Sequence, residues 1–362
     1  MQINFLTKMI NKISIFVLFF QLSHCPFACG QNNAPQTAPP EPQRIFKVTE
    51  DTAKSKTRSK EIDLKQTSEE MSFYIRMPKS WTPEKAAERK KKGQKSVRAL
   101  LMIFSHHWND EQLFNTLTKA GWFSYLLKFA DENDLAVGVS PNFGGYNKGI
   151  SGDEMTPTEY KESSKIFSER FLGWERGLRR MINYYNLPSK NIMAYGISGG
   201  AQQLHRVAMR RPEYFAGIHI HVNSSYDIPS PQASKVLWLV TTGECEYGYP
   251  AACRFYEKMV EYRYRVIFRA EPNLGHENSP ETTRLSLEFF KYLLTFVPDE
   301  TDPNWKPPPV DQFYMMQHPI YVGDYLNHVV YPLEKASQNI EPEHMVPLPT
   351  RPIAEKWGTI MK

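Results

Sequence analysis

The sequence is short of cysteine and, beyond its N-terminus, of long apolar runs, and each scarcity excludes a class of protein. Four cysteines occur among 362 residues, and none belongs to a Cys-x-x-Cys or Cys/His cluster with zinc-ligand spacing. A structural zinc site is therefore not expected. No apolar run of about 18 residues, the length that spans a bilayer, follows the N-terminal segment, so the chain is not a protein with several membrane spans. The sequence also contains no internal repeat.

The chain carries little net charge. Lys and Arg number 44 and Asp and Glu number 39, which gives a formal charge of +5. Part of this excess lies in one short run from Arg89 to Lys95, and no aromatic residues interleave with it. We interpret the run as a solvated loop and expect no nucleic-acid partner. The hydrophobic content of 41% is enough for a folded core.

Residues 1–30 are typical of a signal peptide. Two lysines precede a short apolar stretch at 13–22, and Ala28 and Gly30 supply the small residues that a signal peptidase recognises. We therefore predict a secreted or periplasmic protein. The alternative is a lipoprotein acylated on Cys29 and held at the cell surface, although the residues before Cys29 fit a lipobox poorly.

Export also bears on the remaining cysteines. Cleavage after Gly30 leaves Cys245 and Cys253, eight residues apart. In an oxidising compartment this pair is a candidate disulfide.

Composition divides the rest of the chain into three parts. Residues 31–65 are Pro-rich and then charged, and we expect a flexible linker. Residues 66–297 carry the strand and helix patterns of a catalytic domain. Residues 298–362 hold 11 of the 27 prolines but also several aromatic residues. This extension is expected to be an irregular strap packed on the domain.

The domain alternates between strand and helix patterns. Strands are predicted at 71–77, 97–105, 135–140, 191–197, 216–222, 235–241 and 264–270. Helices are predicted at 111–131, 157–186, 199–210, 251–263 and 279–296, and a polar surface loop at 79–96. The alternation favours an α/β fold with a mainly parallel sheet and helices on both faces. Ligands in such folds bind beyond the carboxyl ends of the strands.

One serine stands in the setting that a nucleophile requires. The segment Gly196-Ile197-Ser198-Gly199-Gly200 follows a predicted strand and opens a predicted helix. A strand-to-helix turn of this kind exposes the serine hydroxyl and aims the helix N-terminus at developing negative charge. We predict that Ser198 is a catalytic nucleophile.

A serine nucleophile needs a base and an acid that orients the base, in the chain order Ser, acid, His. His276 lies in a loop between the last strand and the last helix of the domain, so we predict that it is the base. The acid should follow strand 235–241, where Glu244 and Glu246 compete. Glu246 is preferred from its place in the loop, and Asp227 is a third option.

The oxyanion hole needs two backbone donors. Gly199 supplies one amide, and the loop after strand 97–105 should supply the other. That loop reads His106-His107-Trp108, and the Trp108 amide is the predicted donor, with His107 beside the substrate. The paired histidines lack a carboxylate at ligand spacing, so no metal is expected.

These motifs resemble those of the α/β-hydrolase superfamily. The resemblance rests on strand 97–105 with its His-His-Trp loop, on the segment 194–202 and on Gly275-His276, and it covers roughly residues 70–297. Within the superfamily the chain is most similar to secreted esterases of the polyhydroxybutyrate-depolymerase and feruloyl or acetylxylan esterase type. The resemblance implies a Ser-acid-His hydrolase without a bound cofactor. The chain departs from the pattern where His107 replaces a glycine and where a glutamate replaces the commoner aspartate.

The expected function is hydrolysis of carboxylic esters by an exported serine enzyme. A Gly-rich loop at 141–156 and the segment 223–227, which includes Tyr226, should border the site. Both are polar and aromatic, which favours carbohydrate or phenolic esters, small or polymeric, and makes Tyr226 a candidate substrate-binding residue. The alternatives are a serine peptidase of the same fold, against which no propeller-like domain precedes the hydrolase region, and a non-catalytic surface binding protein.

Overall fold

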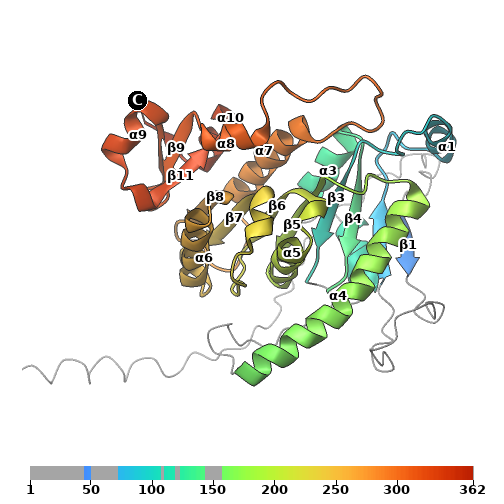
Figure 1. Ribbon diagram of the computed structural model, residues 1–362, viewed down its shortest axis with the longest axis horizontal. Helices are drawn as coiled ribbons and strands as arrows, with labels where there is room; N and C mark the ends of the chain where they lie inside the picture. The colour runs from blue at the N-terminus through green and yellow to red at the C-terminus, as the bar shows by residue number, and fades with distance from the viewer. Residues whose placement is uncertain (1–44, 50–71, 107–109, 119–122, 143–156, 362) are drawn as a thin grey trace, which may run out of the picture. The chain divides into compact units, whose positions relative to one another are not determined.

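The computed structural model describes residues 45–49, 72–106, 110–118, 123–142 and 157–361. Within these ranges the chain forms an eight-stranded sheet of order β1-β2-β4-β3-β5-β6-β7-β8, flanked by helices (Figure 1). The predicted signal peptide at 1–30 lies outside the described residues. No helix in the described ranges is both long and apolar enough to cross a bilayer.

The strands of this sheet are mainly parallel. The first two pairings in sheet order are antiparallel, β1 with β2 and β2 with β4, whereas the pairings from β4 to β8 are all parallel. The strands are β1 (Ile45–Thr49), β2 (Ser72–Arg76), β3 (Ala99–Phe104), β4 (Leu135–Ser140), β5 (Ile192–Ile197), β6 (Phe215–His221), β7 (Leu237–Gly243) and β8 (Arg265–Glu271). This is the strand order of the α/β-hydrolase fold, and the predicted fold class is confirmed.

Helices cover both faces of the sheet. On one face lie α4 (Pro157–Tyr185), α5 (Gly199–Arg210) and α6 (Tyr249–Glu261), and on the other lie α3 (Ser124–Glu132) and α7 (Pro280–Phe296) (Figure 1). Strands β3 to β7 are buried along their whole length. Their continuous apolar runs are what a strand covered on both faces requires.

Three segments differ from the expectations drawn from the sequence. Strand β1 lies inside the range 31–65 that was expected to be a linker, where five residues are too few to show a period against a polar background. Helix α1 (Pro83–Lys91) occupies the expected loop at 79–96, and because it buries no residue it has no apolar stripe to reveal it. The expected helix at 111–131 is two helices, α2 (Asp110–Thr118) and α3.

The C-terminal extension is regular rather than an irregular strap. It forms a four-stranded sheet of order β11-β9-β10-β12 with three short helices. The strands are β9 (Tyr321–Asp324), β10 (Val329–Pro332), β11 (Met345–Leu348) and β12 (Thr359–Ile360), and the helices are α8 (Gln312–Gln317), α9 (Leu333–Asn339) and α10 (Arg351–Trp357). Strands of two to four residues are too short for alternation to be recognised.

The extension packs on the β8 edge of the main sheet. The indole of Trp357 is buried and its Nε1 donates to the Phe268 carbonyl at 2.7 Å. The Tyr256 hydroxyl donates to the Met345 carbonyl at 2.6 Å. Aromatic rings of Tyr256, Phe268 and Tyr325 meet edge to face and stacked in the same interface. The extension and the hydrolase region therefore share one apolar core.

Candidate active site

Ser198 lies on a strained turn between β5 and α5. Its backbone has φ 53° and ψ −124°, a region that few residues other than glycine adopt and that costs on the order of 1–3 kcal/mol. The amide of Ser198 donates to the His221 carbonyl at 3.0 Å, and its carbonyl accepts from the Gln202 amide at 3.0 Å. These backbone bonds hold the turn and direct the hydroxyl out of the sheet.

The two outer glycines of the turn are required by close approach. A Cβ on Gly200 would lie 1.9 Å from the Phe104 carbonyl oxygen, and one on Gly196 would lie 2.8 Å from the Gly200 oxygen. Any side chain at either position would push α5 away from β3 and β5. The Gly-x-Ser-x-Gly pattern is thus a packing requirement that places the serine at the helix N-terminus.

The serine, one histidine and one glutamate form a continuous hydrogen-bonded series. His276 Nε2 lies 2.9 Å from Ser198 Oγ, and His276 Nδ1 lies 2.9 Å from Glu246 Oε2. The imidazole is 42% exposed and the Glu246 side chain is 1% exposed. A buried carboxylate at Nδ1 keeps the proton there and leaves Nε2 free to accept the serine proton.

The other two candidate carboxylates have different partners. Glu244 Oε1 lies 2.9 Å from Nε2 of His328, which belongs to the C-terminal extension. Asp227 accepts from Arg206 Nε at 3.0 Å. Burial alone would raise the pKa of Asp227, but the hydrogen bonds and charges of His205 and Arg206 hold it well below its usual range.

The oxyanion side of the site is described in part. The Gly199 amide is at the first turn of α5, where amides have no partner within the helix. His107 and Trp108, the other residues predicted here, lie outside the described residues. Asn142 lies beside Gly199, since its Nδ2 would be 3.3 Å from a Cβ on that glycine. Gln203 Nε2 donates to Asn142 Oδ1, and Asn142 Nδ2 donates to the His106 carbonyl at 3.4 Å.

An exposed tyrosine flanks the histidine. The ring of Tyr247 stacks on the imidazole of His276 with centroids 6.0 Å apart and an angle of 20°, and it is 75% exposed. Its hydroxyl donates to Ser224 Oγ at 3.1 Å, and Ser224 Oγ also accepts from Gln202 Nε2 at 3.1 Å. Tyr247 therefore presents a fixed aromatic face at the mouth of the site.

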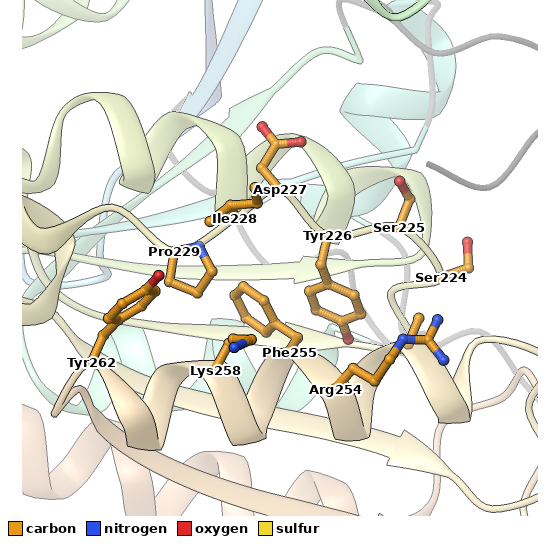
Figure 2. Close-up of a pocket in the computed structure, with 11 residues that line it drawn as sticks. Ser224, Ser225, Tyr226, Asp227, Ile228, Pro229, Arg254, Phe255, Lys258 and Tyr262 are labelled. Atoms are coloured by element: carbon orange, nitrogen blue, oxygen red, sulfur yellow. The ribbon is translucent and has the colours of Figure 1, made fainter. Parts of the chain in front are cut away.

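A cavity of about 380 Å³ adjoins Ser224. Figure 2 shows its two walls, the β6–β7 connection above and α6 below, with the rings of Tyr226 and Phe255 side by side between them. These rings stack with centroids 4.3 Å apart. Burial, followed by the nearby Cys253 and Glu246, raises the pKa of the Tyr226 phenol well above its usual range. Tyr226 thus contributes its ring to the cavity, while its hydroxyl is buried.

Cys245 lies in the acid loop between β7 and α6, Cys253 lies in α6, and both are free thiols. The predicted disulfide is therefore wrong for this structure. Cys245 is exposed in the turn, whereas Cys253 is half-buried in the second turn of α6 beside the Tyr249 hydroxyl. The start of α6 separates the two side chains. The loop is held instead by backbone bonds, including Cys245 N to the Leu274 carbonyl at 2.9 Å.

Within the described ranges, no three His, Cys, Asp or Glu side chains gather as metal ligands would. Ser198, His276 and Glu246 form one hydrogen-bonded series beside the ring of Tyr247, and the aromatic cavity adjoins Ser224. Asn142 belongs to the loop 141–156 that was expected to border the site, whereas Gln203 and Tyr247 were not singled out from the sequence. Tyr247 directly follows Glu246, so a search for aromatic residues next to the acid would have found it.

No family model and no curated protein sequence matches the chain. Its fold is similar to that of a thermostable esterase, with 14% identity, a TM-score of 0.41 and coverage of 58% of this chain and 52% of that one. A ferulic acid esterase is 13% identical, with a TM-score of 0.39 and coverage of 72% of this chain and 99% of that one. A putative dipeptidyl aminopeptidase IV from Bacteroides ovatus is 12% identical, with a TM-score of 0.45 and coverage of 69% of this chain and 35% of that one. The chain spans about half the length of the first esterase and about a third of the peptidase. These likenesses concern the fold alone.

Both Cys245 and Cys253 should react with iodoacetamide in the folded, unreduced protein. Cys245 should react first because it is exposed, and Cys253 should lag because burial raises the pKa of its thiol, although a hydrogen bond with Tyr249 acts in the opposite direction. Peptide mapping by mass spectrometry after timed alkylation checks this order. A peptide pair joined through Cys245 and Cys253 would contradict it.

Proposed function

We propose that the chain is an exported serine hydrolase that cleaves carboxylic esters with Ser198 as nucleophile, His276 as base and Glu246 as orienting acid. The observation that carries the proposal is the series of two 2.9 Å hydrogen bonds from Ser198 Oγ through the imidazole to Glu246. A serine hydroxyl is a weak nucleophile unless a positioned base removes its proton. The Ser-acid-His geometry supplies that base.

The reaction proceeds in two halves. Ser198 Oγ attacks the ester carbonyl while His276 Nε2 takes the hydroxyl proton, and the resulting imidazolium then protonates the departing alcohol. Water enters, gives a proton to the same nitrogen and attacks the acyl-serine, and the imidazolium then returns that proton to Ser198 Oγ as the bond to the acyl group breaks and the acid is released. Glu246 stabilises the imidazolium in both halves because its carboxylate is buried against Nδ1.

Charge that develops on the carbonyl oxygen needs donors that are already oriented. The Gly199 amide at the N-terminus of α5 is one. The second proposed donor is the Trp108 amide, with His107 beside it, as expected from the sequence. The Asn142 side chain, which accepts from Gln203 and donates to the His106 carbonyl, lies next to Gly199 on the same side.

The aromatic surroundings support carbohydrate or phenolic esters as substrates. Tyr247 offers an exposed ring next to His276, and the cavity beyond Ser224 is walled by Tyr226 and Phe255. Flat rings and sugar faces pack on such surfaces, whereas two polar residues of the lining, Ser224 and Arg254, suit hydroxyl groups (Figure 2). The signal-like N-terminus supports a secreted or periplasmic location, with a lipid anchor at Cys29 as the alternative.

Replacing Ser198 with alanine should abolish most activity and leave the fold intact. The expected loss in kcat is about 10⁴-fold or more, because the remaining groups have no nucleophile to activate. Steady-state hydrolysis of p-nitrophenyl acetate measures it, and an aminoacyl-nitroanilide assayed in parallel separates an esterase from a peptidase. A variant that keeps a tenth of the activity would remove Ser198 from the mechanism.

The two acid-loop glutamates form a matched pair for testing the acid. Glu246→Gln should lower kcat by about 10³- to 10⁴-fold, because an amide does not hold the imidazole in the required tautomer. Glu244→Gln should leave kcat near that of the unaltered chain, since Glu244 contacts His328 and not His276. The same ester assay compares them, and a larger loss for Glu244→Gln would show that the acid is misassigned.

Tyr247 should contribute to binding of ring-bearing substrates. Tyr247→Ala should raise KM for feruloylated or acetylated sugars by about 2- to 10-fold, the value of one aromatic contact. Tyr247→Phe keeps the ring and should retain most of the affinity. Initial rates with these sugars and with a small alkyl acetate measure the difference. An equal rise in KM for the alkyl acetate would argue against a platform for rings.

A further inference from the structure

A buried chain of polar side chains crosses the sheet beneath the candidate active site. His219 and His221 lie two residues apart on β6 and therefore face the same side of the sheet. His219 Nδ1 lies 3.0 Å from Ser286 Oγ on α7, and its Nε2 lies 2.7 Å from Thr241 Oγ1 on β7. His221 Nδ1 lies 2.8 Å from the same hydroxyl. All four side chains are at most 1% exposed.

The chain ends on the backbone next to the proposed base. His221 Nε2 lies 3.1 Å from the carbonyl oxygen of Glu277, the residue after His276. We call residues 272–278 the base loop. On the other side of His276, the Leu274 carbonyl accepts from the Cys245 amide at 2.9 Å. The base loop is thus fixed on both sides of an imidazole that is itself largely exposed.

The carbonyl group at the end of this series of hydrogen bonds decides which atom donates in each bond. A carbonyl oxygen only accepts, so His221 Nε2 carries the proton and donates to Glu277. Burial lowers the pKa of His221 to about 4, against the opposing effect of its hydrogen bonds, and the neutral ring leaves Nδ1 as an acceptor for the Thr241 hydroxyl. The Thr241 oxygen then accepts from His219 Nε2, and His219 Nδ1 accepts from Ser286. Each group has one arrangement that satisfies it.

The backbone of His221 has a second role. Its carbonyl accepts the Ser198 amide at 3.0 Å, on the far side of the residue from its bond to Glu277. One residue therefore contacts the backbone of both the nucleophile turn and the base loop. Within the described residues, the His221 ring bonds to Thr241 and Glu277 and makes no hydrogen bond with Ser198 Oγ or the His276 ring, so its hydrogen bonds act on the position of the base loop and not on the reacting atoms.

We propose that His221 is a positioning residue that holds the base loop and the nucleophile turn in their relative positions, and that the Thr241 hydroxyl, as the partner of Nδ1, holds the His221 ring in the orientation that points Nε2 at Glu277. The proposal rests on the proposed function of Ser198 and His276. A base that is misplaced by about 1 Å can cost on the order of 100-fold in rate. Because the buried side chains belong to the rigid strands β6 and β7, they hold the exposed imidazole of His276 in one position.

Glutamine and asparagine carry the same amide group but differ in length. Replacing His221 with each therefore tests whether contact with Glu277 is what matters. His221→Gln can present an amide N–H near the place of the ring Nε2, so it should keep the bond to Glu277. His221→Asn is too short to reach it. With p-nitrophenyl acetate, we expect His221→Asn to lower kcat by about 10- to 100-fold and to leave KM within about threefold, whereas His221→Gln should recover most of kcat.

Hydrogen exchange of the base loop gives a readout that does not need catalysis. Amides of 272–278 should exchange faster in His221→Asn than in the unaltered chain, and His221→Gln should restore their protection. If no variant and no unaltered chain hydrolyses esters, the proposed function fails, and the exchange result still decides the positioning role. Equal kcat and equal protection in the Asn and Gln variants would overturn the proposal.

A second pair guards against a His221→Asn chain that does not fold. Thr241→Val removes, at nearly constant volume, the hydroxyl that holds the orientation of the His221 ring, and Thr241→Ser keeps that hydroxyl. We expect Thr241→Val to lose rate and base-loop protection and Thr241→Ser to retain both. A Thr241→Val variant with unchanged kcat and unchanged exchange would overturn the proposal in the same way.

Discussion

The hydrogen bond of 2.9 Å between Ser198 Oγ and His276 Nε2 is the contact on which the rest of the site depends. It joins loops that follow β5 and β8, and the sheet order places β6 and β7 between those strands. Three strand spacings amount to about 14 Å, so the two loops must reach towards each other above the intervening strands. The groups that hold them come from those strands: His221 from β6, Thr241 from β7, and Glu246 from the loop after β7.

This arrangement carries costs that the surrounding packing offsets. Ser198 has a strained backbone, and the polar rings of His219 and His221 are fully buried. The strain persists because Gly196 and Gly200 allow α5 to pack directly on the sheet. The histidines are tolerated because hydroxyl and carbonyl partners satisfy both ring nitrogens of each. The C-terminal extension also helps to hold the acid loop, since His328 contacts Glu244 in that loop.

Much of this could be predicted from the sequence, and what could not has physical causes. Buried strands such as 97–105 and 191–197 were evident because parallel strands covered on both faces are continuously apolar. The nucleophile turn was evident because its glycines are a steric requirement. Helix α1 and the short strands of the extension were not evident. Helix α1 buries no residue, and strands of two to four residues are too short to show a hydrophobic period. The roles of His221 and Thr241 were hidden because they depend on strands far apart in sequence, and the free thiols because a spacing of eight residues does not reveal the intervening helix start.

The most direct test of the account is the site at which a fluorophosphonate labels the protein. The probe forms a stable bond with a serine only where a base removes the hydroxyl proton and donors stabilise the oxyanion. Mass spectrometry of the digested adduct should find one phosphonate per chain, on the peptide that contains Ser198, and the labelling should disappear in His276→Ala. A chain that stays unlabelled, or that carries the label on another residue, would contradict the claim that Ser198, His276 and Glu246 work as one catalytic unit.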